Sequence, residues 1–280
     1  GRGWARKRRT DPGPGAGGNR HLIRLKTVEE IEQIHAAGQI VAGVLEIVAT
    51  QVEPGMTTEQ LDRLAESFIR DHEGAEPAFK GLYGFPSTLC TSLNEEVVHG
   101  IPSVSRKVTS GDLISVDVGV KTGGMFADAA ITIPVGDVSP EAERLLRVTR
   151  EALDLGVAEA QPGARLGDVG AAIQEHVEAA GYSVVRELVG HGVGPEPHEE
   201  PHVPNFGRRG RGEVLDSGLV IAIEPMVNDG ARHIRTLADG WTVVTADGSL
   251  SAHFEHTVAV TTGGPRVLTV RPATANLMEE

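Results

Sequence analysis

Two aspartates in neighbouring predicted strands have the spacing of a carboxylate pair that could bind divalent cations. Asp117 and Asp128 each lie in an alternating stretch, on the face opposite the aliphatic residues. A turn centred on Thr122 and Gly123 would place the two residues directly opposite each other, with Cβ atoms about 4.5–5.5 Å apart. Carboxylates this close repel each other unless a proton or a cation lies between them. The pair therefore favours a site for two bridged metal ions about 3.5–4 Å apart, and an exposed acidic pair is the alternative.

Two glutamates and a histidine could complete such a site. Glu224 follows the apolar run 219–223, and Glu255 precedes an alternating apolar stretch. Acids are rarely buried unless they are paired or bound to a metal ion, although each glutamate could instead be exposed on its strand. His191 lies between glycines in a histidine-rich loop, and glycine permits backbone conformations that other residues avoid. A neutral imidazole is the commonest protein ligand for metal ions, so a surface loop is only the alternative here.

The chemistry of this ligand set indicates which ions could bind. Carboxylates combined with an imidazole suit hard to borderline divalent ions, namely Mn, Fe, Co or Zn. The set contains no cysteine, which argues against a structural zinc site. His99 precedes a predicted turn and could donate a hydrogen bond to a substrate, and a capping role agrees equally well with its local sequence.

The elements that position these residues begin with a pair of predicted helices. Thr27 and Glu30 form a capping box before the first helix, and apolar residues follow at helical spacing. The chain then breaks at Pro54-Gly55. Thr57 caps a second amphipathic helix, which is predicted to end at Gly74.

A second pair of predicted helices resembles the first. One helix opens at Ser139-Pro140, with proline at its first helical position. The next follows Pro162-Gly163 and ends at Gly181. A shift of 108 residues places Pro54-Gly55 on Pro162-Gly163. Although chance is the alternative, this similarity predicts a weak internal duplication, with two related halves around a common centre.

Predicted strands occupy much of the remaining sequence, at residues 112–120, 126–135, 219–227, 241–246 and 251–260. The dipeptide Asp247-Gly248 predicts a hairpin between residues 241–246 and the segment that begins at Ser249. Together the helices and strands predict an α+β fold.

The bulk composition is that of an ordinary globular protein. The 280 residues are 40% hydrophobic and 23% charged, and no uninterrupted run approaches the roughly 18 apolar residues of a membrane helix. The basic N-terminal residues are followed by a Gly/Pro-rich stretch and not by an apolar one, which argues against a signal peptide. Cys90 is the single cysteine, so an intrachain disulfide is excluded and a reducing cytoplasm is expected. The composition therefore predicts a cytoplasmic protein without a membrane partner.

The charge is unevenly distributed between the two ends of the chain. Residues 1–20 form a basic, Gly/Pro/Arg-rich tail that is predicted to be disordered, and residues 21–280 are predicted to form a single domain. Residues 1–26 carry a net charge of +7, whereas the whole chain carries −13 and the remainder therefore −20. The acidic body argues against a general nucleic-acid surface. The basic arm could contact ribosomal RNA through phosphates, and a disordered segment without a partner is the alternative.

Five segments resemble type I methionine aminopeptidases, in the order and at the spacing of that family. They are residues 94–102 (NEEVVHGIP), 112–132 (DLISVDVGVKTGGMFADAAIT), 190–201 (GHGVGPEPHEEP), 223–226 (IEPM) and 241–257 (WTVVTADGSLSAHFEHT). The resemblance extends over residues 22–269. It implies the pita-bread fold, in which two pseudo-symmetric halves each place helices behind a shared antiparallel sheet.

The resemblance also implies roles for individual residues. Two divalent metal ions would be bound by Asp117, Asp128, His191, Glu224 and Glu255, with Asp128 and Glu255 bridging. Glu224 would also act as the general base, and His99 and His198 would flank the substrate. The methionine side chain would contact Phe85, Cys90 and Trp241.

The activity implied is removal of the N-terminal methionine from nascent polypeptides with a small second residue, by a protein expected to be a monomer. Some residues near the expected pocket differ from the family's usual choices, and these departures concern the shape of the pocket. They are Phe79, Leu82, Phe85, Val98 and Pro197.

Three alternatives agree less well with the sequence. A proline-specific aminopeptidase or prolidase of the same fold usually has a large additional N-terminal domain, and only about 20 residues precede the first predicted helix. Type II methionine aminopeptidases carry an insertion before the second glutamate motif, yet here His198 and Glu224 are 26 residues apart. A non-catalytic peptide- or RNA-binding member of the fold would tend to lose metal ligands, and here all five acceptable residue types are present.

Overall fold

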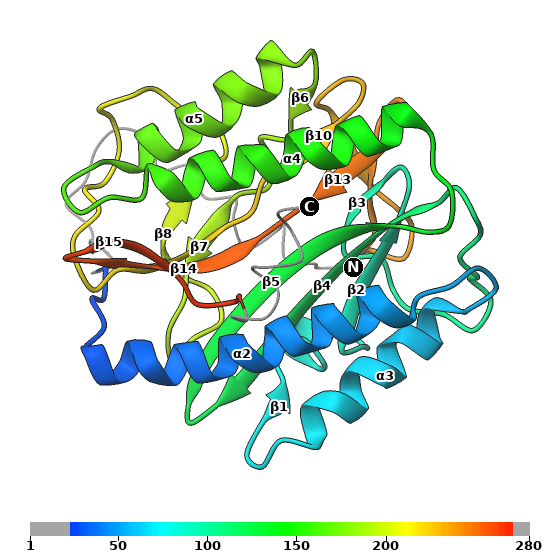
Figure 1. Cartoon of the computed structure of the whole chain (residues 1–280), viewed down its shortest axis with the longest axis horizontal. Helices are drawn as coiled ribbons and strands as arrows, with labels where there is room; N and C mark the ends of the chain where they lie inside the picture. The colour runs from blue at the N-terminus through cyan, green and yellow to red at the C-terminus, as the bar shows by residue number, and fades with distance from the viewer. Residues whose placement is uncertain (1–22, 271–280) are drawn as a thin grey trace.

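Residues 23–270 are described by a computed structural model of the chain. The predicted tail at residues 1–20 lies outside the described residues, as do residues 271–280. Two pairs of helices lie on opposite sides of a central group of strands, with α2 and α3 on one side and α4 and α5 on the other (Figure 1). This arrangement agrees with the predicted α+β class and with two related halves. The single-domain boundary at residue 21 stays a prediction.

The four predicted helices are all present, and three of the caps are those predicted. The capping box of Thr27 and Glu30 begins α2, Thr57 begins α3, and Ser139 begins α4 with Pro140 at the first helical position. The helices α3 and α5 end a few residues before the predicted glycines, Gly74 and Gly181, which adopt the positive φ of the following turn. The helices are α2 (Val28–Gln51), α3 (Thr58–Arg70), the 3-10 helix η1 (Leu82–Gly84), α4 (Pro140–Ala158) and α5 (Leu166–Ala179).

Fifteen strands are present among the described residues, several of them only two or three residues long. The strands are β1 (Glu76–Pro77), β2 (Leu89–Leu93), β3 (Glu96–Val98), β4 (Leu113–Thr122), β5 (Met125–Pro134), β6 (Ser183–Val184), β7 (Gly190–Gly192), β8 (Glu199–Val203), β9 (Val220–Ile223), β10 (Met226–Asn228), β11 (Ile234–Thr236), β12 (Val243–Thr245), β13 (Ser251–His253), β14 (His256–Thr261) and β15 (Gly264–Val267).

The strands form four antiparallel sheets. In the first, β4 pairs with β5 on one edge and with β1 and β2 on the other. The second and third sheets have three strands each, in the orders β13-β10-β6 and β11-β12-β3, and the fourth has the order β15-β14-β9-β7-β8. An isolated bridge between Ala130 and Glu255 joins β5 to the chain between β13 and β14, and it connects the two halves at their centre.

Each pair of helices covers its own apolar core. Buried side chains of α2 and α3 pack against β4 and β5, and those of α4 and α5 pack against β9, β10, β13 and β14. By length and composition α2 could cross a membrane, although polar residues such as Gln39 and Glu46 interrupt its apolar sequence. Its buried face packs on the first sheet, as expected for a core helix.

Matching hydrogen bonds in the two halves support the predicted duplication. The amide of Gly55 donates to the carbonyl of Val108 at 2.8 Å, and that of Gly163 donates to the carbonyl of Leu215, also at 2.8 Å. Both glycines have positive φ, 99° and 85°. The two Pro-Gly breaks therefore have matching hydrogen bonds, and each lies next to a matching isolated bridge, Thr57 with Lys107 and Arg165 with Val214, as two copies of one unit would.

The predicted register between the two aspartates is wrong by two residues. Asp117 lies opposite Ala130, and Asp128 lies opposite Gly119. The turn is centred on Gly123 and Gly124, which have φ of 57° and 80°. A two-residue hairpin turn with positive φ at both central positions suits two glycines and disfavours a β-branched threonine. Because the error is an even number of residues, both carboxylates keep the predicted face of the sheet.

The predicted hairpin at Asp247-Gly248 is also wrong. The chain does turn there, and Gly248 has a φ of 77°. However, β12 pairs with β11 and β3, whereas β13 pairs with β10. The Asp247 carboxylate accepts hydrogen bonds from the Ala231 and Ser249 amides, so this turn stabilises a neighbouring loop and does not connect two paired strands.

Candidate metal centre

The residues predicted to bind metal line one cavity between the two halves. Its walls include all five predicted ligands, together with His99 and His198, which come from seven separate segments of the chain. The polar residues around the cavity are His99, Asp117, Asp128, His191, His198, Glu224, His253 and Glu255. Two of the predicted ligands come from the first sheet and three from the second half, so the cavity depends on the way the halves meet.

Two predicted strands are interrupted at the glutamates that face the cavity. The segment 219–227 is divided into β9 and β10 at Glu224 and Pro225, and the segment 251–260 is divided into β13 and β14 at Glu255. Asn205 donates a hydrogen bond to the Glu224 carbonyl at 3.1 Å, and the Glu255 amide donates to the Ala130 carbonyl at 2.9 Å. These contacts hold each backbone break in place beside the cavity.

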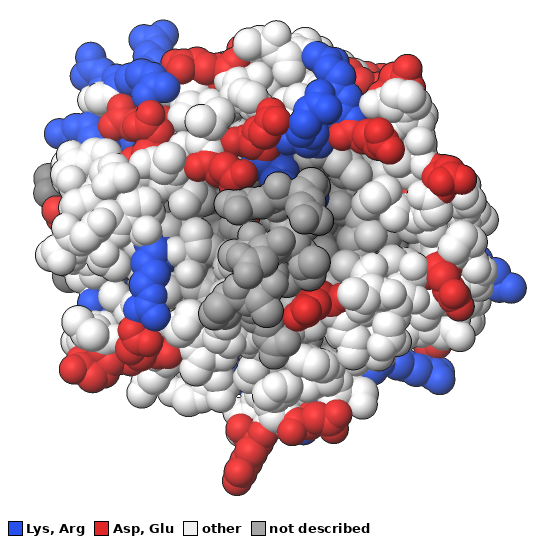
Figure 2. All heavy atoms as spheres, viewed as in Figure 1, with Lys and Arg blue, Asp and Glu red and all other residues white. Residues whose placement is uncertain are grey.

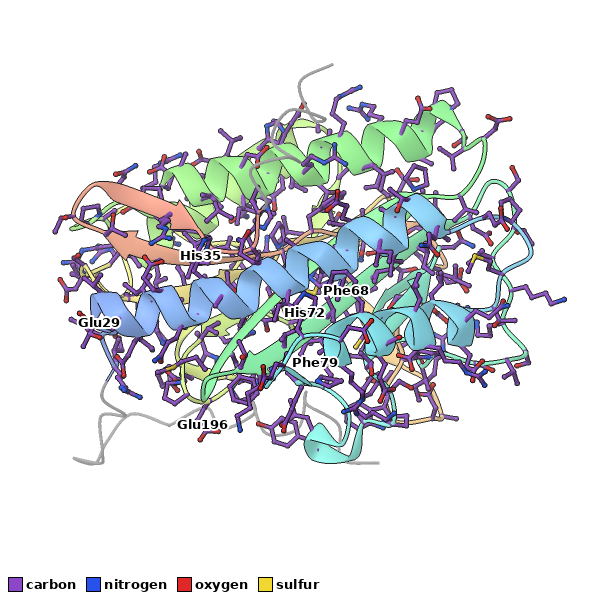
Figure 3. All side chains as sticks on the ribbon, turned by 60° about the horizontal axis from the view of Figure 1, so that its bottom comes forward. Glu29, His35, Phe68, His72, Phe79 and Glu196 are labelled. Atoms are coloured by element: carbon purple, nitrogen blue, oxygen red, sulfur yellow. The ribbon has the colours of Figure 1, made fainter. Side chains whose placement is uncertain are left out.

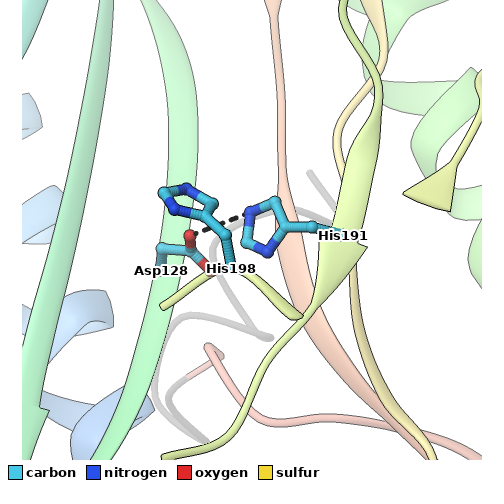
Figure 4. Close-up of side chains that lie close together, drawn as sticks. All are labelled: Asp128, His191 and His198. Atoms are coloured by element: carbon cyan, nitrogen blue, oxygen red, sulfur yellow. Dashed lines mark ion pairs between the residues drawn. The ribbon is translucent and has the colours of Figure 1, made fainter. Parts of the chain in front are cut away.

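His191 lies at the centre of the polar cluster. Its Nε2 atom is 3.3 Å from Asp128 Oδ2 and 3.5 Å from Glu224 Oε1, and its Nδ1 atom is 2.9 Å from the Gly192 carbonyl oxygen. An Nδ1–H group donating to that carbonyl leaves Nε2 available as a ligand. Figure 4 shows Asp128, His191 and His198 converging from β5, β7 and the loop after β7.

The ligand atoms are close enough to hold cations. Potential ligand atoms of Asp128, His191 and His198 all lie within 4.8 Å of one another, and so do those of His191, Glu224 and Glu255. The two groups share His191, so they form one continuous cluster. Its oxygen and nitrogen donors suit a hard to borderline divalent ion.

The electrostatics of the cavity indicate a shortage of positive charge. Burial, and then the nearby carboxylates of Asp128 and Glu224, raise the pKa of Asp117 well above its usual range. Burial lowers the pKa of His191, but Asp128 and Glu224 outweigh it and the net pKa is raised. Among the described residues, Asp117 Oδ1 and His253 Nε2 are buried without a hydrogen-bond partner. Buried polar atoms are rarely left in this state, and a divalent cation would satisfy the acidic group.

Threonine and strand pairing position the aspartates. The Thr257 hydroxyl lies 2.8 Å from the Asp128 carbonyl oxygen and 3.2 Å from Asp128 Oδ1, and it accepts a hydrogen bond from the Asp128 amide at 3.2 Å. Thr257 is fully buried. Such contacts outside the ligands fix the orientation of a metal-binding carboxylate.

His99 is held at the cavity in a strained conformation. Its φ of 62° lies in the left-handed region, which is unusual for a residue other than glycine. The following residue, Gly100, donates from its amide to Ser92 Oγ at 3.1 Å and accepts from the Thr91 amide at 2.8 Å. Strain of this kind often accompanies a functional position, which agrees with the predicted contact between His99 and a substrate.

The three predicted pocket residues lie together beside the carboxylates of the cavity. Phe85 and Cys90 are buried in one apolar cluster with Phe79, and Trp241 packs against it. The Phe85 and Trp241 rings meet edge to face, with centroids 5.1 Å apart. Cys90 lies opposite Asp117 in the β2–β4 pair. The cluster therefore offers an apolar surface next to the cavity.

His253 is the polar cavity residue that the sequence interpretation did not include in the site. Its Nε2 atom is 4.0 Å from Glu224 Oε2, and its side chain is almost fully buried. Burial lowers its pKa to about 4, partly offset by Asp128. The alternation of residues along a strand places His253 on the face of Glu255, which is the one sequence signal that points to it.

The comparisons with known proteins agree with this geometry. The model of metallopeptidase family M24 matches residues 32–262. The methionine aminopeptidase of Clostridium perfringens is 52% identical over 249 residues, which are 89% of this chain and 99% of that protein.

Solved structures of related proteins have the same fold. The crystal structure of the methionine aminopeptidase from Thermotoga maritima superposes with a TM-score of 0.88 at 45% identity, covering 89% of this chain and all of that one. The prolidase from Pyrococcus furiosus superposes with a TM-score of 0.70 at 25% identity, and the match covers 88% of this chain and only 65% of the prolidase.

Proposed function

This chain belongs to metallopeptidase family M24, and from that membership we infer that it removes the N-terminal methionine from polypeptides by hydrolysing the first peptide bond. It is a metal-dependent exopeptidase with the pita-bread fold of its relatives. The identity of 52% to a methionine aminopeptidase over nearly its full length favours this substrate, whereas the prolidase match is weaker and partial. The finer preference for a small second residue is part of the proposal.

The convergence of five potential ligands on one cavity is the observation that carries the mechanism. We propose that Asp117, Asp128, His191, Glu224 and Glu255 hold two divalent ions, with Mn, Fe, Co and Zn as candidates. The unpartnered Asp117 carboxylate oxygen and the raised pKa of that group support a bound cation. When bound, such ions lower the pKa of a coordinated water and polarise a carbonyl group.

The side chains around the cavity divide the remaining work. Glu224, at the break between β9 and β10, accepts the proton of the attacking water and passes it to the leaving amine. His198 donates a hydrogen bond to the scissile carbonyl oxygen and stabilises the negative charge that develops there. His99 forms a hydrogen bond with the scissile amide nitrogen. The apolar cluster of Phe85, Cys90 and Trp241 receives the methionine side chain.

Three further expectations belong to the same proposal. We expect a cytoplasmic protein, because a single buried cysteine suits a reducing compartment. We also expect it to be a monomer. On the face in Figure 2, basic side chains lie beside acidic ones, and the described residues show several such pairs, for example Arg209 with Glu159 and Glu175. Ribosome contact would therefore depend on the N-terminal arm, and a salt-dependent loss of RNA binding on its deletion would test it.

The test combines metal analysis with peptide hydrolysis. The metal-loaded protein should contain two ions per chain and release methionine from Met-Ala-Ser, and chelation should abolish this activity. Glu224→Gln should fold but lose activity by at least about 100-fold, whereas Glu200→Gln, in the same acidic region but outside the cavity lining, should retain it. A metal-free, inactive protein that still binds the peptide would favour a binding module, and cleavage of Xaa-Pro substrates alone would favour a prolidase.

A further inference from the structure

A largely buried ion pair connects the residue just before the N-cap of α2 to the loop that carries His198. Lys26 Nζ lies 2.6 Å from Glu199 Oε2, and the Lys26 side chain has no exposed surface. The same ammonium donates to the Arg24 carbonyl at 3.0 Å, and the Lys26 amide donates to the Gly218 carbonyl at 2.7 Å. Glu199 follows His198 directly. The ion pair therefore fixes the residue next to a cavity histidine.

The other oxygen of Glu199 closes the loop on itself. Oε1 accepts a hydrogen bond from the Glu196 amide at 3.2 Å, and the Gly194 amide donates to the Glu196 carbonyl at 3.2 Å. Figure 3 shows Glu196 on this loop, below Glu29 at the start of α2. The Gly194 carbonyl in turn accepts a hydrogen bond at 2.9 Å from the amide of Phe126, a residue of β5 that lies two positions before Asp128. The Glu199 carboxylate thus joins residue 199 to residue 196, and the Gly194 backbone joins the same loop to β5.

The lysine stem packs tightly against this loop. A Cβ atom at Gly194 would lie 2.5 Å from Lys26 Cε and 2.6 Å from Glu199 Oε1, so the backbone and the ion pair are in direct contact. His198 itself meets the His191 ring at 4.4 Å between centroids and the Tyr83 ring at 6.2 Å. His198 therefore lies between the ion pair of the following residue and the rings of His191 and Tyr83, and these contacts restrict its rotation away from the cavity.

We propose that Lys26 and Glu199 are positioning residues, whose ion pair holds the 194–199 loop so that the His198 imidazole faces the cavity. This inference rests on the proposed function, since His198 is taken to contact the substrate. Removing both charges of a largely buried pair together can leave stability nearly unchanged, because desolvation offsets much of their attraction. A contribution to geometry can therefore be separated from a contribution to folding.

The experiment uses the full chain with Lys26→Met, Glu199→Gln and the double variant, with Lys26→Arg as the conservative replacement. Arg266→Met/Glu32→Gln is the matched control, because this exposed ion pair also joins α2 to a distant segment. The double variant should melt near the wild-type temperature. Its kcat for Met-Ala-Ser should fall about 10- to 100-fold with KM changed no more than about twofold, and Lys26→Arg should recover most of the activity. The control pair should keep the wild-type kcat.

A second readout does not depend on catalysis. In the metal-free protein, the His198 imidazole carbon–proton resonance, assigned by its loss in His198→Ala, should shift or broaden in the double variant and remain unchanged in the control. A folded double variant with wild-type kcat and an unchanged resonance would overturn the inference, as would Lys26→Arg behaving like Lys26→Met. If the wild type failed to cleave Met-Ala-Ser, the proposed function would fail, and the resonance would still decide the positioning role.

Discussion

Cys90 and Asp117 lie directly opposite each other on β2 and β4, so the single thiol of the chain borders the carboxylates of the cavity. Burial, and then the negative charge of Asp117, raise the pKa of the Cys90 thiol well above its usual range. The thiolate is the reactive form of cysteine. Position and charge together therefore predict an inert cysteine at the edge of the proposed substrate pocket.

The first prediction is that Cys90 does not react with alkylating or disulfide reagents in the folded protein at pH 8. Labelling by 5,5′-dithiobis(2-nitrobenzoate) should be at least about 100-fold slower than in guanidinium chloride, because the thiol is both buried and protonated. A Met-Ala-Ser peptide would not change this rate much. Rapid labelling of the native protein would show that the thiol is exposed and would contradict the placement of Cys90 in the pocket.

The second prediction concerns Thr257, whose hydroxyl contacts the backbone and carboxylate of Asp128. Thr257→Val keeps the shape but leaves polar groups of Asp128 unsatisfied, which should cost about 1–3 kcal/mol of unfolding free energy. Metal affinity should fall about 10- to 100-fold, the usual effect of losing a contact that orients a ligand. Denaturant unfolding and metal titration calorimetry measure the two effects.

Thr50→Val is the control for this change, because the Thr50 hydroxyl bonds only to carbonyls of its own helix in the described structure and is exposed. It should alter neither metal affinity nor activity. If Thr257→Val destabilised the protein but bound metal as the wild type does, Thr257 would support the fold and not the orientation of Asp128.

The face on which the candidate ligands Asp117 and Asp128 lie could be predicted from sequence because strand alternation is local. Asp117 and Asp128 keep their predicted face even though the register is wrong by two residues, since an even shift preserves the side of the sheet. The turn residues decided the register itself. The sequence allows a turn centred on Thr122 and Gly123 or one centred on Gly123 and Gly124. The folded chain has the second turn, in which both glycines adopt a positive φ.

Long-range pairing could not be read from local patterns. Asp247-Gly248 has the sequence of a hairpin turn, but the strands on either side of it do not pair with each other. Strand β12 pairs with β3 and β11, and β13 pairs with β10. The strand breaks at Glu224 and Glu255 likewise depend on partners from distant segments, Asn205 and Ala130. His253 was missed as a site residue because alternation shows its face but not that this face is buried.

The third prediction is a loss of stability in acid that depends on His253. Burial lowers the pKa of this imidazole to about 4, whereas it is about 6.5 in an unfolded chain. Between these values the unfolded chain binds a proton that the folded protein excludes, so stability is present above pH 6.5 and is lost as the pH falls towards 4. Over this window the metal-free protein should lose up to about 3 kcal/mol through this group.

His253→Gln removes the titrating group and keeps a polar side chain of similar length. Its unfolding free energy, measured by urea denaturation between pH 7 and pH 4.5, should fall less steeply than that of the wild type. His202→Gln, which replaces an exposed histidine, should follow the wild-type curve. Parallel curves for His253→Gln and the wild type would mean that the folded protein accepts the proton on this imidazole.

The last prediction is that Asp117 destabilises the metal-free protein and stabilises the metal-bound one. Because burial, Asp128 and Glu224 raise its folded pKa, its contribution to stability is complete below about pH 3.9, the value for an unfolded chain, and is lost as the pH rises through the folded pKa. In a chelator at pH 7, Asp117→Asn should therefore be more stable than the wild type, by about 1–2 kcal/mol, a common gain when a functional site is relieved of strain. This advantage should shrink in acid.

Added Mn²⁺ or Co²⁺ should reverse the order, because an ion that binds only the folded protein stabilises it in proportion to its affinity, and Asp117→Asn weakens that affinity. Melting curves with chelator and with metal measure the difference in stability between Asp117→Asn and the wild type under each condition. Asp62→Asn is the control: Asp62 is a buried carboxylate with a raised pKa, chiefly from burial, and it accepts a hydrogen bond from the Leu89 amide away from the cavity. It should respond to metal as the wild type does. If Asp117→Asn were less stable than the wild type in chelator across the whole pH range, the crowding of carboxylates would not be the feature that makes this cavity bind cations.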